Sequence, residues 1–447
     1  MHFMSFCTIF VQLLPIKLKK HTCMLLEFTC ANFRSISHKC TLSLKAQGIS
    51  DAPQDNVVKL GTNTKVLKTA AIYGANSSGK SNMIKAFLSM IYHIIESVRL
   101  NDGDKLIYDP FKLSIAKDRP TYFEVMFILN NTTYRYGFEF TESTIVGEWL
   151  YSSPVGGKRE KYLFIRTKDG IGVNEKTFVE GIGKESSTME NRLFLSLCAQ
   201  LNGELSKSII AKLKEMNAIS GLESRGYSGY SKIMLHHREK GYDSAIEFFN
   251  KTQLGFESIE TTEADFDESI LPEDLPAELR EGLIKQLSGK KAIELFSKHN
   301  IYNKNGDVVG FTVFDIEDES EGTKKLIELS GPIFDTLANG QVLWIDELDA
   351  KMHPLISQHI VELFNNPKTN PLNAQLIFST HDTHLLSSKL LRRDQIWFTE
   401  KDAMEQTDLY NMMDIELPDG NKPRNDSNYE RNYIAGRYGA IPFILNE

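Results

Sequence analysis

The stretch Gly74-Ala75-Asn76-Ser77-Ser78-Gly79-Lys80-Ser81 has the spacing GxxxxGKS, which is typical of a loop that wraps a phosphate group. Its glycines let the backbone approach the phosphate because they carry no side chain. Successive N–H groups and the N-terminus of the following helix then face the anion. In such loops the lysine, here Lys80, reaches the outer phosphates of a nucleoside triphosphate, and the hydroxyl of Ser81 ligates Mg²⁺.

The residues on either side fit this interpretation. The apolar run Val66–Tyr73 predicts a buried strand before the loop. After the loop, apolar residues recur at helical spacing, at Ile84, Phe87, Leu88, Ile91, Ile94, Ile95 and Val98. Strand, glycine loop and helix form the context that the motif requires. Nucleotide binding is therefore favoured over the alternative, a plain glycine turn.

Composition and charge narrow the class of protein. The chain has 447 residues, enough for two or three domains, and 41% of them are hydrophobic. Its net charge of −8 argues against DNA binding by the whole surface, although a local basic groove remains open. Ten acidic residues and one basic residue lie between Glu257 and Glu281. This segment is either a solvated loop or a docking surface for a basic partner.

Cysteine and hydropathy patterns predict a cytoplasmic protein. The five cysteines have no CxxC spacing, which argues against a disulfide framework and a zinc site. Residues 1–23 are apolar from Phe3 to Ile16 and then basic, a poor match to a secretory signal and too short to span a membrane. We expect them to be an extension upstream of the true start, with the domain opening at Met24. The alternative is an interfacial anchor.

After residues 1–23, the pattern along the chain predicts an α/β fold with three further parts. Residues 24–180 are expected to form an N-terminal lobe with the phosphate-binding loop and an antiparallel meander over 121–166. Residues 181–300 are expected to be a helical insertion that includes the acidic segment. Residues 301–447 alternate apolar strands with helices, the rhythm of a parallel sheet.

A second candidate site element follows the strand Val342–Ile345, which ends in Asp346 and Glu347. A strand that is apolar on both faces belongs in the middle of a parallel sheet, and ligands bind at the carboxyl ends of such strands. We expect Asp346 to hold Mg²⁺ and Glu347 to act as the general base that activates water. The alternative is an acidic strand end without chemistry.

Ser379-Thr380-His381 follows the next predicted strand, Gln375–Phe378. His381 is expected to hydrogen-bond the γ-phosphate or the attacking water, the alternative being a structural histidine. A metal site formed by His381, Asp382 and His384 is disfavoured, since no further ligands are apparent.

Ser320-Glu321-Gly322-Thr323 begins another predicted helix and forms a second candidate anion site. Because the loop at Gly74–Ser81 already supplies one phosphate site, a second helix start of this kind suggests that nucleotides are shared between chains. Ser320 and Gly322 are the candidate contacts.

In this order, the motifs resemble those of ABC-type ATPases, in the branch that includes SMC, RecF and the OLD nucleases. Within it, the chain resembles the stand-alone AAA-type ATPases of phage-defence operons, such as abortive-infection ATPases and the ATPase subunit of the PARIS system. The resemblance runs from about Met24 to the C-terminus. It is carried by Asn32-Phe33-Arg34-Ser35, Gly74–Ser81, Tyr134-Arg135-Tyr136-Gly137-Phe138, Glu319–Thr323, Asp346-Glu347-Leu348-Asp349, His353-Pro354, Ser379-Thr380-His381 and Gly436–Pro442.

The resemblance implies an ABC-type ATPase head that binds ATP and Mg²⁺ and hydrolyses ATP. Copies of the chain would assemble as a homodimer or a higher homo-oligomer. Ser320 and Gly322 of one copy would close over ATP held by another. Asp349 would lie at the dimer contact, Arg34 near the phosphates, and His381 would be the switch histidine.

Two motifs depart from the family pattern. The signature reads Ser-Glu-Gly-Thr where transporters have Leu-Ser-Gly-Gly-Gln. No glutamine lies between Gln54 and Gln200 to form a Q-loop, so the region around Asp109-Pro110-Phe111 is a candidate replacement.

These features lead to a main hypothesis: an ATP-driven switch that regulates a separate toxin or nuclease, encoded nearby, in anti-phage defence. The alternative is a DNA-binding ATPase of the SMC or RecF kind. A transporter ATPase is disfavoured by the large insertion and the signature. A structural protein with a dead nucleotide site is disfavoured by the complete set of site residues.

Overall fold

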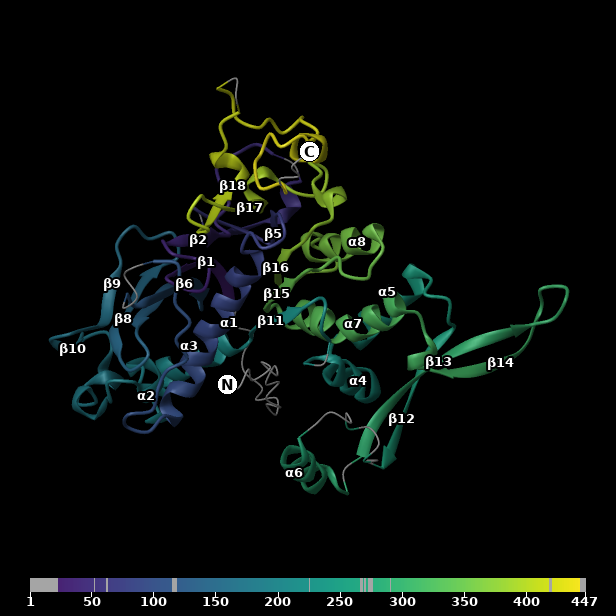
Figure 1. Ribbon diagram of the computed structural model, residues 1–447, viewed down its shortest axis with the longest axis horizontal. Coiled ribbons are helices and arrows are strands. Elements are labelled where there is room, and N and C mark those ends of the chain that lie inside the picture. The colour runs from purple at the N-terminus through teal and green to yellow at the C-terminus, as the bar shows by residue number, and fades with distance from the viewer. Residues whose placement is uncertain are drawn as a thin grey trace. The chain divides into compact units, whose positions relative to one another are not determined.

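The computed structural model describes residues 23–442, except 52, 62, 115–118, 225, 266–267, 269–270, 272–275, 290 and 418–419 (Figure 1). The predicted extension 1–23 therefore lies, except for Cys23, outside the described residues. The described chain forms two units. The larger unit contains residues 23–222 and 339–442, and the smaller unit contains residues 223–338.

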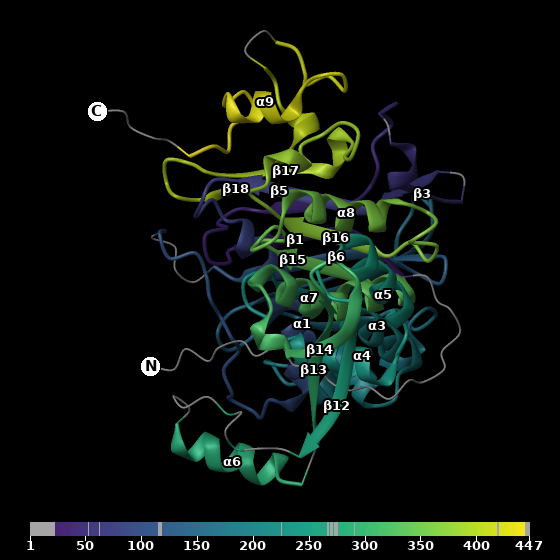
Figure 2. The ribbon, with the colours of Figure 1, turned by 90° about the vertical axis from the view of Figure 1, so that its right-hand side faces the viewer.

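A six-stranded sheet forms the core of the larger unit. Its strands are β5 (Thr69–Gly74), β11 (Met216–Ser220), β15 (Val342–Asp346), β16 (Gln375–Ser379), β17 (Ile396–Lys401) and β18 (Thr407–Asn411). Their order is β11-β15-β16-β5-β17-β18, and every neighbouring pair is parallel except β17 with β18. In Figure 2 these strands follow one another from β18 and β17 down to β15. Every residue of β5 and β16 is buried, as expected for central strands of a parallel sheet.

A seven-stranded antiparallel sheet is the second layer of the larger unit. Its order is β10-β9-β8-β7-β6-β1-β2. The strands are β1 (Cys23–Ala31), β2 (Cys40–Ser43), β6 (Thr121–Leu129), β7 (Thr132–Phe140), β8 (Ile145–Pro154), β9 (Lys161–Thr167) and β10 (Gly170–Val173). The predicted meander over 121–166 is thus present as β6 to β9, and β6 and β7 are joined at Asn130-Asn131.

The long helix α1 (Lys80–Glu96) packs against strands of both sheets. Its Phe87 stacks on Trp344 of β15, with ring centroids 4.7 Å apart, and meets Phe28 of β1 edge to face at 5.3 Å. All three rings are fully buried. Burial of such side chains contributes on the order of 2–3 kcal/mol each, so α1 is anchored from both sides. The loop at its N-terminus is therefore held in a fixed place.

The remaining elements of the larger unit lie around these layers. They are the hairpin β3 (Val57–Leu60) with β4 (Thr64–Leu67) and helices α2 (Phe194–Gln200), α3 (Glu204–Lys214), α8 (Pro354–Asn365) and α9 (Tyr429–Ile434). Figure 1 shows α1 on one side of the core sheet and α8 on the other. The helices on both faces explain why the central strands are apolar throughout.

In its described residues, the smaller unit combines four α-helices with a three-stranded sheet. Its elements are α4 (Ser228–His237), α5 (Tyr242–Thr252), β12 (Ser258–Asp265), α6 (Ala277–Leu287), β13 (Lys291–Tyr302), β14 (Val308–Asp315) and α7 (Glu321–Asn339). The sheet order is β12-β13-β14, antiparallel throughout. Within α7, Pro332 leaves Glu328 O without its usual N–H partner. The Ser231 hydroxyl of α4 donates to this carbonyl instead.

The structure confirms the α/β class, with a mixed core sheet and an antiparallel β-sheet beside it. Three details differ from expectation. Val66–Tyr73 is split between β4 and β5, because β4 pairs with β3 whereas β5 pairs with β16 and β17 of the core sheet. The expected helical insertion over 181–300 also contains the strands β11, β12 and most of β13. The first part of the acidic segment is strand β12 rather than a loop, since its glutamates pair with lysines of β13.

The unit boundaries at 222/223 and 338/339 do not coincide with the expected ones at 180/181 and 300/301. Part of the expected insertion, β11, belongs to the core sheet because it pairs with β15. Cys23, Cys30, Cys40 and Cys198 are free and buried. Among the described residues, no helix is long and apolar enough to cross a membrane, and no group of three or more metal-binding side chains forms a cluster.

Candidate nucleotide-binding site

The loop Gly74–Ser81 joins β5 to α1, as the motif predicts. Gly79 has a φ of +116°, a left-handed conformation that side chains disfavour, and a Cβ there would collide with the side chain of Thr407. A Cβ at Gly74 would lie 2.5 Å from Thr399 O and 2.6 Å from Ser78 Oγ. Only glycine fits either position. The tip of the loop, Asn76 and Ser77, is exposed, which leaves its backbone open to a ligand.

Lys80 lies at the first turn of α1 and is only 5% exposed. Its ammonium donates to Gly74 O at 2.8 Å and Ala75 O at 3.1 Å, so it closes the loop on itself. Burial lowers the pKa of Lys80, while Asp346, Glu347 and Asp349 act in the opposite direction. The lysine and the three carboxylates therefore share one electrostatic environment.

Two threonines from the β17–β18 hairpin form hydrogen bonds with the phosphate-binding loop or with the strand that precedes it. Ser78 Oγ lies 2.6 Å from Thr399 Oγ1, which donates to Tyr73 O at 3.3 Å. Thr407 donates to Ser78 O at 2.9 Å. The sequence did not point to either threonine, because both lie more than 300 residues after the loop and belong to no motif.

The two carboxylates follow β15, as predicted. Asp346 is its last residue, and its Oδ1 accepts a hydrogen bond from Ser379 Oγ at 2.6 Å. The same hydroxyl accepts from Glu347 N at 2.8 Å. Glu347 has a φ of +56°, an uncommon conformation for a residue with a side chain. Ser379 therefore fixes the turn that presents both carboxylates, and it is a site residue to which the sequence assigned no role of its own.

The core strand order explains how His381 joins this group. β16 lies between β15 and β5, so the residues that follow it emerge between the carboxylates and the loop. The backbone N–H of His381 donates to Asp349 Oδ1 at 3.3 Å. Burial and the cation Lys80 lower the pKa of His381, opposed by Asp349, Glu347 and Asp346. A cavity of about 330 Å³ next to it is lined by residues that include Asp349, His381 and His384.

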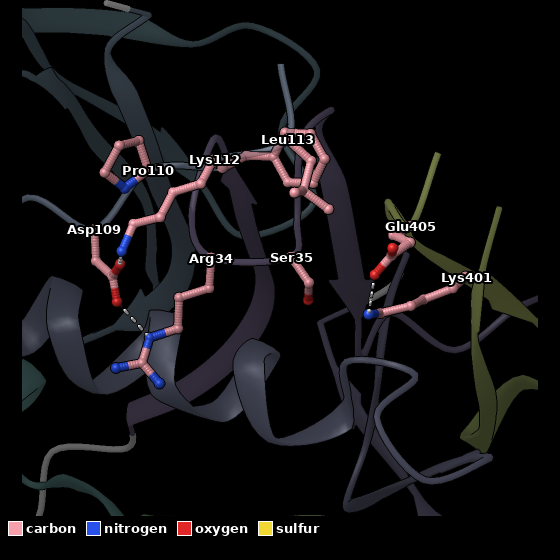
Figure 3. Close-up of a pocket in the computed structure, with 9 residues that line it drawn as sticks. Arg34, Ser35, Asp109, Pro110, Lys112, Leu113, Lys401 and Glu405 are labelled. Atoms are coloured by element: carbon pink, nitrogen blue, oxygen red, sulfur yellow. Dashed lines mark hydrogen bonds and ion pairs between the residues drawn. The ribbon is translucent and has the colours of Figure 1, made fainter. Parts of the chain in front are cut away.

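Arg34 lies in the turn after β1 and has a φ of +51°. Its Nε pairs with Asp109 Oδ2 at 2.8 Å, and Figure 3 shows both residues on one side of a cavity of about 280 Å³, with Lys401 and Glu405 across from them. The neighbouring Ser35 hydroxyl lies 2.7 Å from Thr407 Oγ1 and accepts from Asn82 Nδ2 at 2.7 Å. The Arg34 turn is thus connected to the loop and to α1.

Ser320 and Gly322 lie in the smaller unit, at the N-terminus of α7. Ser320 Oγ accepts from Thr323 N at 3.1 Å, which is the geometry of a helix N-cap. Ser320 is exposed. The remaining predicted site residues, Arg34, Gly74–Ser81, Asp346, Glu347 and His381, all belong to the larger unit.

The donor set fits a magnesium nucleotide. Ser81 offers a hydroxyl and Asp346 a carboxylate, the oxygen ligands that Mg²⁺ prefers, and Mg²⁺ takes most of its remaining ligands from phosphates and water. The buried Lys80 and the exposed backbone of the loop tip match the charge of a triphosphate. A magnesium site of this kind does not require histidine or cysteine ligands.

Comparison with known proteins gives a family and a set of similar structures. A comparison with curated proteins finds no match. Among solved structures, an SMC head bound to the C-winged helix domain of ScpA is similar at 13% identity and a TM-score of 0.33, covering 87% of this chain and 97% of that one. The recombination mediator RecF with ATP is similar at 14% identity and a TM-score of 0.29, covering 80% and 93%.

A family model described as "AAA domain, putative AbiEii toxin, Type IV TA system" matches residues 70–387. The match begins in β5, directly before the phosphate-binding loop, and includes Asp346, Glu347 and His381. Because it spans well over half of the chain, the protein belongs to this AAA family.

Proposed function

We propose that this protein binds ATP with Mg²⁺ and hydrolyses it to ADP and phosphate. One observation carries the proposal. Four side chains lie close together at the carboxyl edge of the core sheet, where β5, β15 and β16 end: Lys80, Asp346, Glu347 and His381. Membership of an AAA family supports the same activity.

In this proposal each site residue has its own role in hydrolysis. The N–H groups of the loop and the Lys80 ammonium bind the phosphates and stabilise the charge that grows on them as the bond to the γ-phosphate breaks. Glu347 takes a proton from the attacking water, whose oxygen bonds to the γ-phosphorus while the bridging oxygen leaves with ADP. His381 orients that water or the γ-phosphate. Mg²⁺, held by Ser81 and Asp346, would neutralise phosphate charge.

A second copy of the chain completes the site in this proposal. Ser320 and Gly322 present the N-terminus of α7, which suits the γ-phosphate of ATP bound to another copy. The exposure of Ser320 supports this role, since an intact cap with an open surface is available to a partner. Asp349 accepts from the backbone N–H of His381, which supports a role for it in linking a dimer contact to the nucleotide. Arg34 would exchange Asp109 for a phosphate.

The regulated target is proposed to be a separate effector protein in anti-phage defence. The family description names a toxin and a toxin–antitoxin system, which supports a role in a system that pairs a toxin with a second protein. The test is co-expression of the chain with the proteins encoded by its neighbouring genes, followed by purification in ADP and in ATP. We expect one neighbour to bind stoichiometrically and to be released or activated in a nucleotide-dependent way. A solitary protein that hydrolyses ATP without any partner would contradict the effector assignment.

A further inference from the structure

The β13–β14 hairpin continues beyond the three-stranded part of its sheet. β12 pairs with Lys291–Lys298 of β13, whereas β14 pairs with Phe296–Tyr302. From His299 onwards, β13 has β14 as its one partner among the described strands. We call residues 299–302 and 308–314 the open ribbon (Figure 1). A two-stranded ribbon without a covering layer is marginally stable in water.

Large apolar side chains are concentrated on the open ribbon. Seven of them are between 41% and 62% exposed, namely Ile301, Tyr302, Val308, Val309, Phe311, Val313 and Phe314. The register places Phe311 opposite Asn300 and Val313 opposite Lys298. Because residues opposite each other share a face, as do alternate residues of one strand, Phe311, Val313 and Lys298 lie on the same side. Lys298 Nζ sits 4.0 Å from the centre of the Phe311 ring. Exposed apolar side chains that share one face, as Phe311 and Val313 do, are typical of an interaction site.

The free edge of β14 also lacks the usual protection against strand pairing. β14 is the outer strand of the sheet among the described residues, and Val308–Phe314 contains neither a charged residue nor proline. Proteins normally place lysine, proline or a covering element on such edges. Hydrogen bonds close the turn at the tip, where Asn303 Oδ1 accepts from Asp307 N at 2.9 Å and from Asn305 N at 2.8 Å. The ribbon therefore presents a preformed template for an added strand.

The charged side chains near the open ribbon indicate which kind of partner it would bind. The smaller unit contains 23 acidic and 13 basic residues. Glu257 binds Asn300 at 3.0 Å and Glu260 lies 3.8 Å from Lys298, so acidic side chains border the apolar face. Asp307 directly precedes β14 and Asp315 is its last residue. A second copy of the same ribbon would bring these carboxylates together, whereas lysine or arginine on a partner would complement them.

We propose that the open ribbon is a docking surface for a different protein, which adds an extended apolar strand flanked by basic side chains to the free edge of β14. This deepens the proposed function, on which it rests, because such a protein would be the effector. Backbone hydrogen bonds to the edge would supply affinity, and the alternating contacts with Phe311 and Val313 would supply specificity.

The test uses the full chain and a fluorescent peptide as the probe. The peptide alternates valine and threonine between two pairs of lysines. One control peptide replaces the lysines with glutamates, and a second places proline at the centre, which removes an edge hydrogen bond. We expect the lysine peptide to bind, salt to weaken it, and both control peptides to bind at least about tenfold weaker. These comparisons require no variant of the protein.

A variant pair then locates the binding surface. Phe311→Ser combined with Val313→Ser is expected to lower affinity for the lysine peptide at least about tenfold. Leu355→Ser, which removes an apolar residue of α8 that is 67% exposed, is the matched control and should change nothing. Equal binding of the glutamate peptide, unchanged binding by the ribbon variant, or no binding at about millimolar peptide would contradict the proposal. Self-association abolished by the ribbon variant would overturn it in favour of a second copy.

ATP binding measured on the same preparations separates this proposal from the proposed function. A chain that binds ATP but not the lysine peptide would refute the docking surface alone. A chain that binds the peptide at the ribbon but never binds ATP would refute the ATPase assignment alone.

Discussion

Ser379 holds the carboxylate of Asp346 with a hydrogen bond of 2.6 Å and, through the same oxygen, accepts from the backbone of Glu347. One fully buried hydroxyl on β16 thus sets the position of two neighbouring acids at the end of β15. The proposed metal ligand and the proposed general base are fixed as a pair. Loss of the hydroxyl should disturb both.

We predict that Ser379→Ala lowers the apparent Mg²⁺ affinity of ATP hydrolysis by about 10- to 100-fold, the usual effect of removing a group that orients a metal ligand. Titration of the hydrolysis rate with Mg²⁺ measures it. Ser357→Ala is the matched control, because Ser357 is equally buried on α8 and its hydroxyl has no hydrogen-bond partner within the described part of the chain. Equal Mg²⁺ dependence of the two variants would contradict the role of Ser379.

Lys80→Ala should lower ATP affinity about 100-fold or more, since it removes a buried cation next to the phosphates. ATP should then no longer raise the melting temperature, whereas we expect it to do so for the unmodified chain. Lys85→Ala provides the comparison, because Lys85 lies on the same helix and is exposed. A normal thermal shift with Lys80→Ala would show that phosphate is bound elsewhere.

Glu347→Gln should retain ATP binding and abolish most hydrolysis, because only the proton acceptor is lost while the side chain keeps its size. ATP should then accumulate in a stable dimer, detectable by light scattering with ATP but not with ADP. Hydrolysis at the unmodified rate would refute the assignment of Glu347 as general base.

His93 should make the protein sensitive to acid. Burial lowers its pKa from the ordinary 6.5 to about 4, and its Nδ1 lies 2.7 Å from Ser89 O inside the core. The unfolded chain takes up a proton on this histidine below pH 6.5 while the folded chain does not, so stability falls as pH decreases through this range. The expected loss by about pH 5 is roughly 2 kcal/mol. Urea unfolding should show this slope, and His93→Gln should remove it. A parallel slope in the variant would contradict the argument.

Much of the candidate site was predictable because its motifs are local. The loop Gly74–Ser81, the pair Asp346-Glu347 and His381 each follow an apolar strand, and parallel strands bring such ends to one edge. Thr399, Thr407 and the orienting role of Ser379 depend on which strands become neighbours, and spacing along the chain does not reveal that order. The roles of all these residues in nucleotide binding and hydrolysis stay predictions, as do those of Arg34, Ser320 and Gly322.

The fold was predictable where the alternation of apolar residues was clear, as in the meander over 121–166. It failed at β12, where three acidic residues outnumber two apolar ones and composition alone favours a loop. There the strand forms because Glu260 and Glu263 meet Lys298 and Lys291 of β13, a relationship across the sheet. β11 was missed because its five residues lie within a helical stretch and are recruited by β15.

The central claim is that ATP lies between the loop of one copy and Ser320 and Gly322 of another, and mixing two inactive variants tests it most directly. Lys80→Ala removes one half of each site, and Ser320→Arg blocks the other half at an exposed position. Mixed dimers of the two contain one complete site, so equimolar mixing should restore about a quarter of the unmodified hydrolysis rate. If the mixture stays inactive while the unmodified protein hydrolyses ATP under the same conditions, the shared site does not exist.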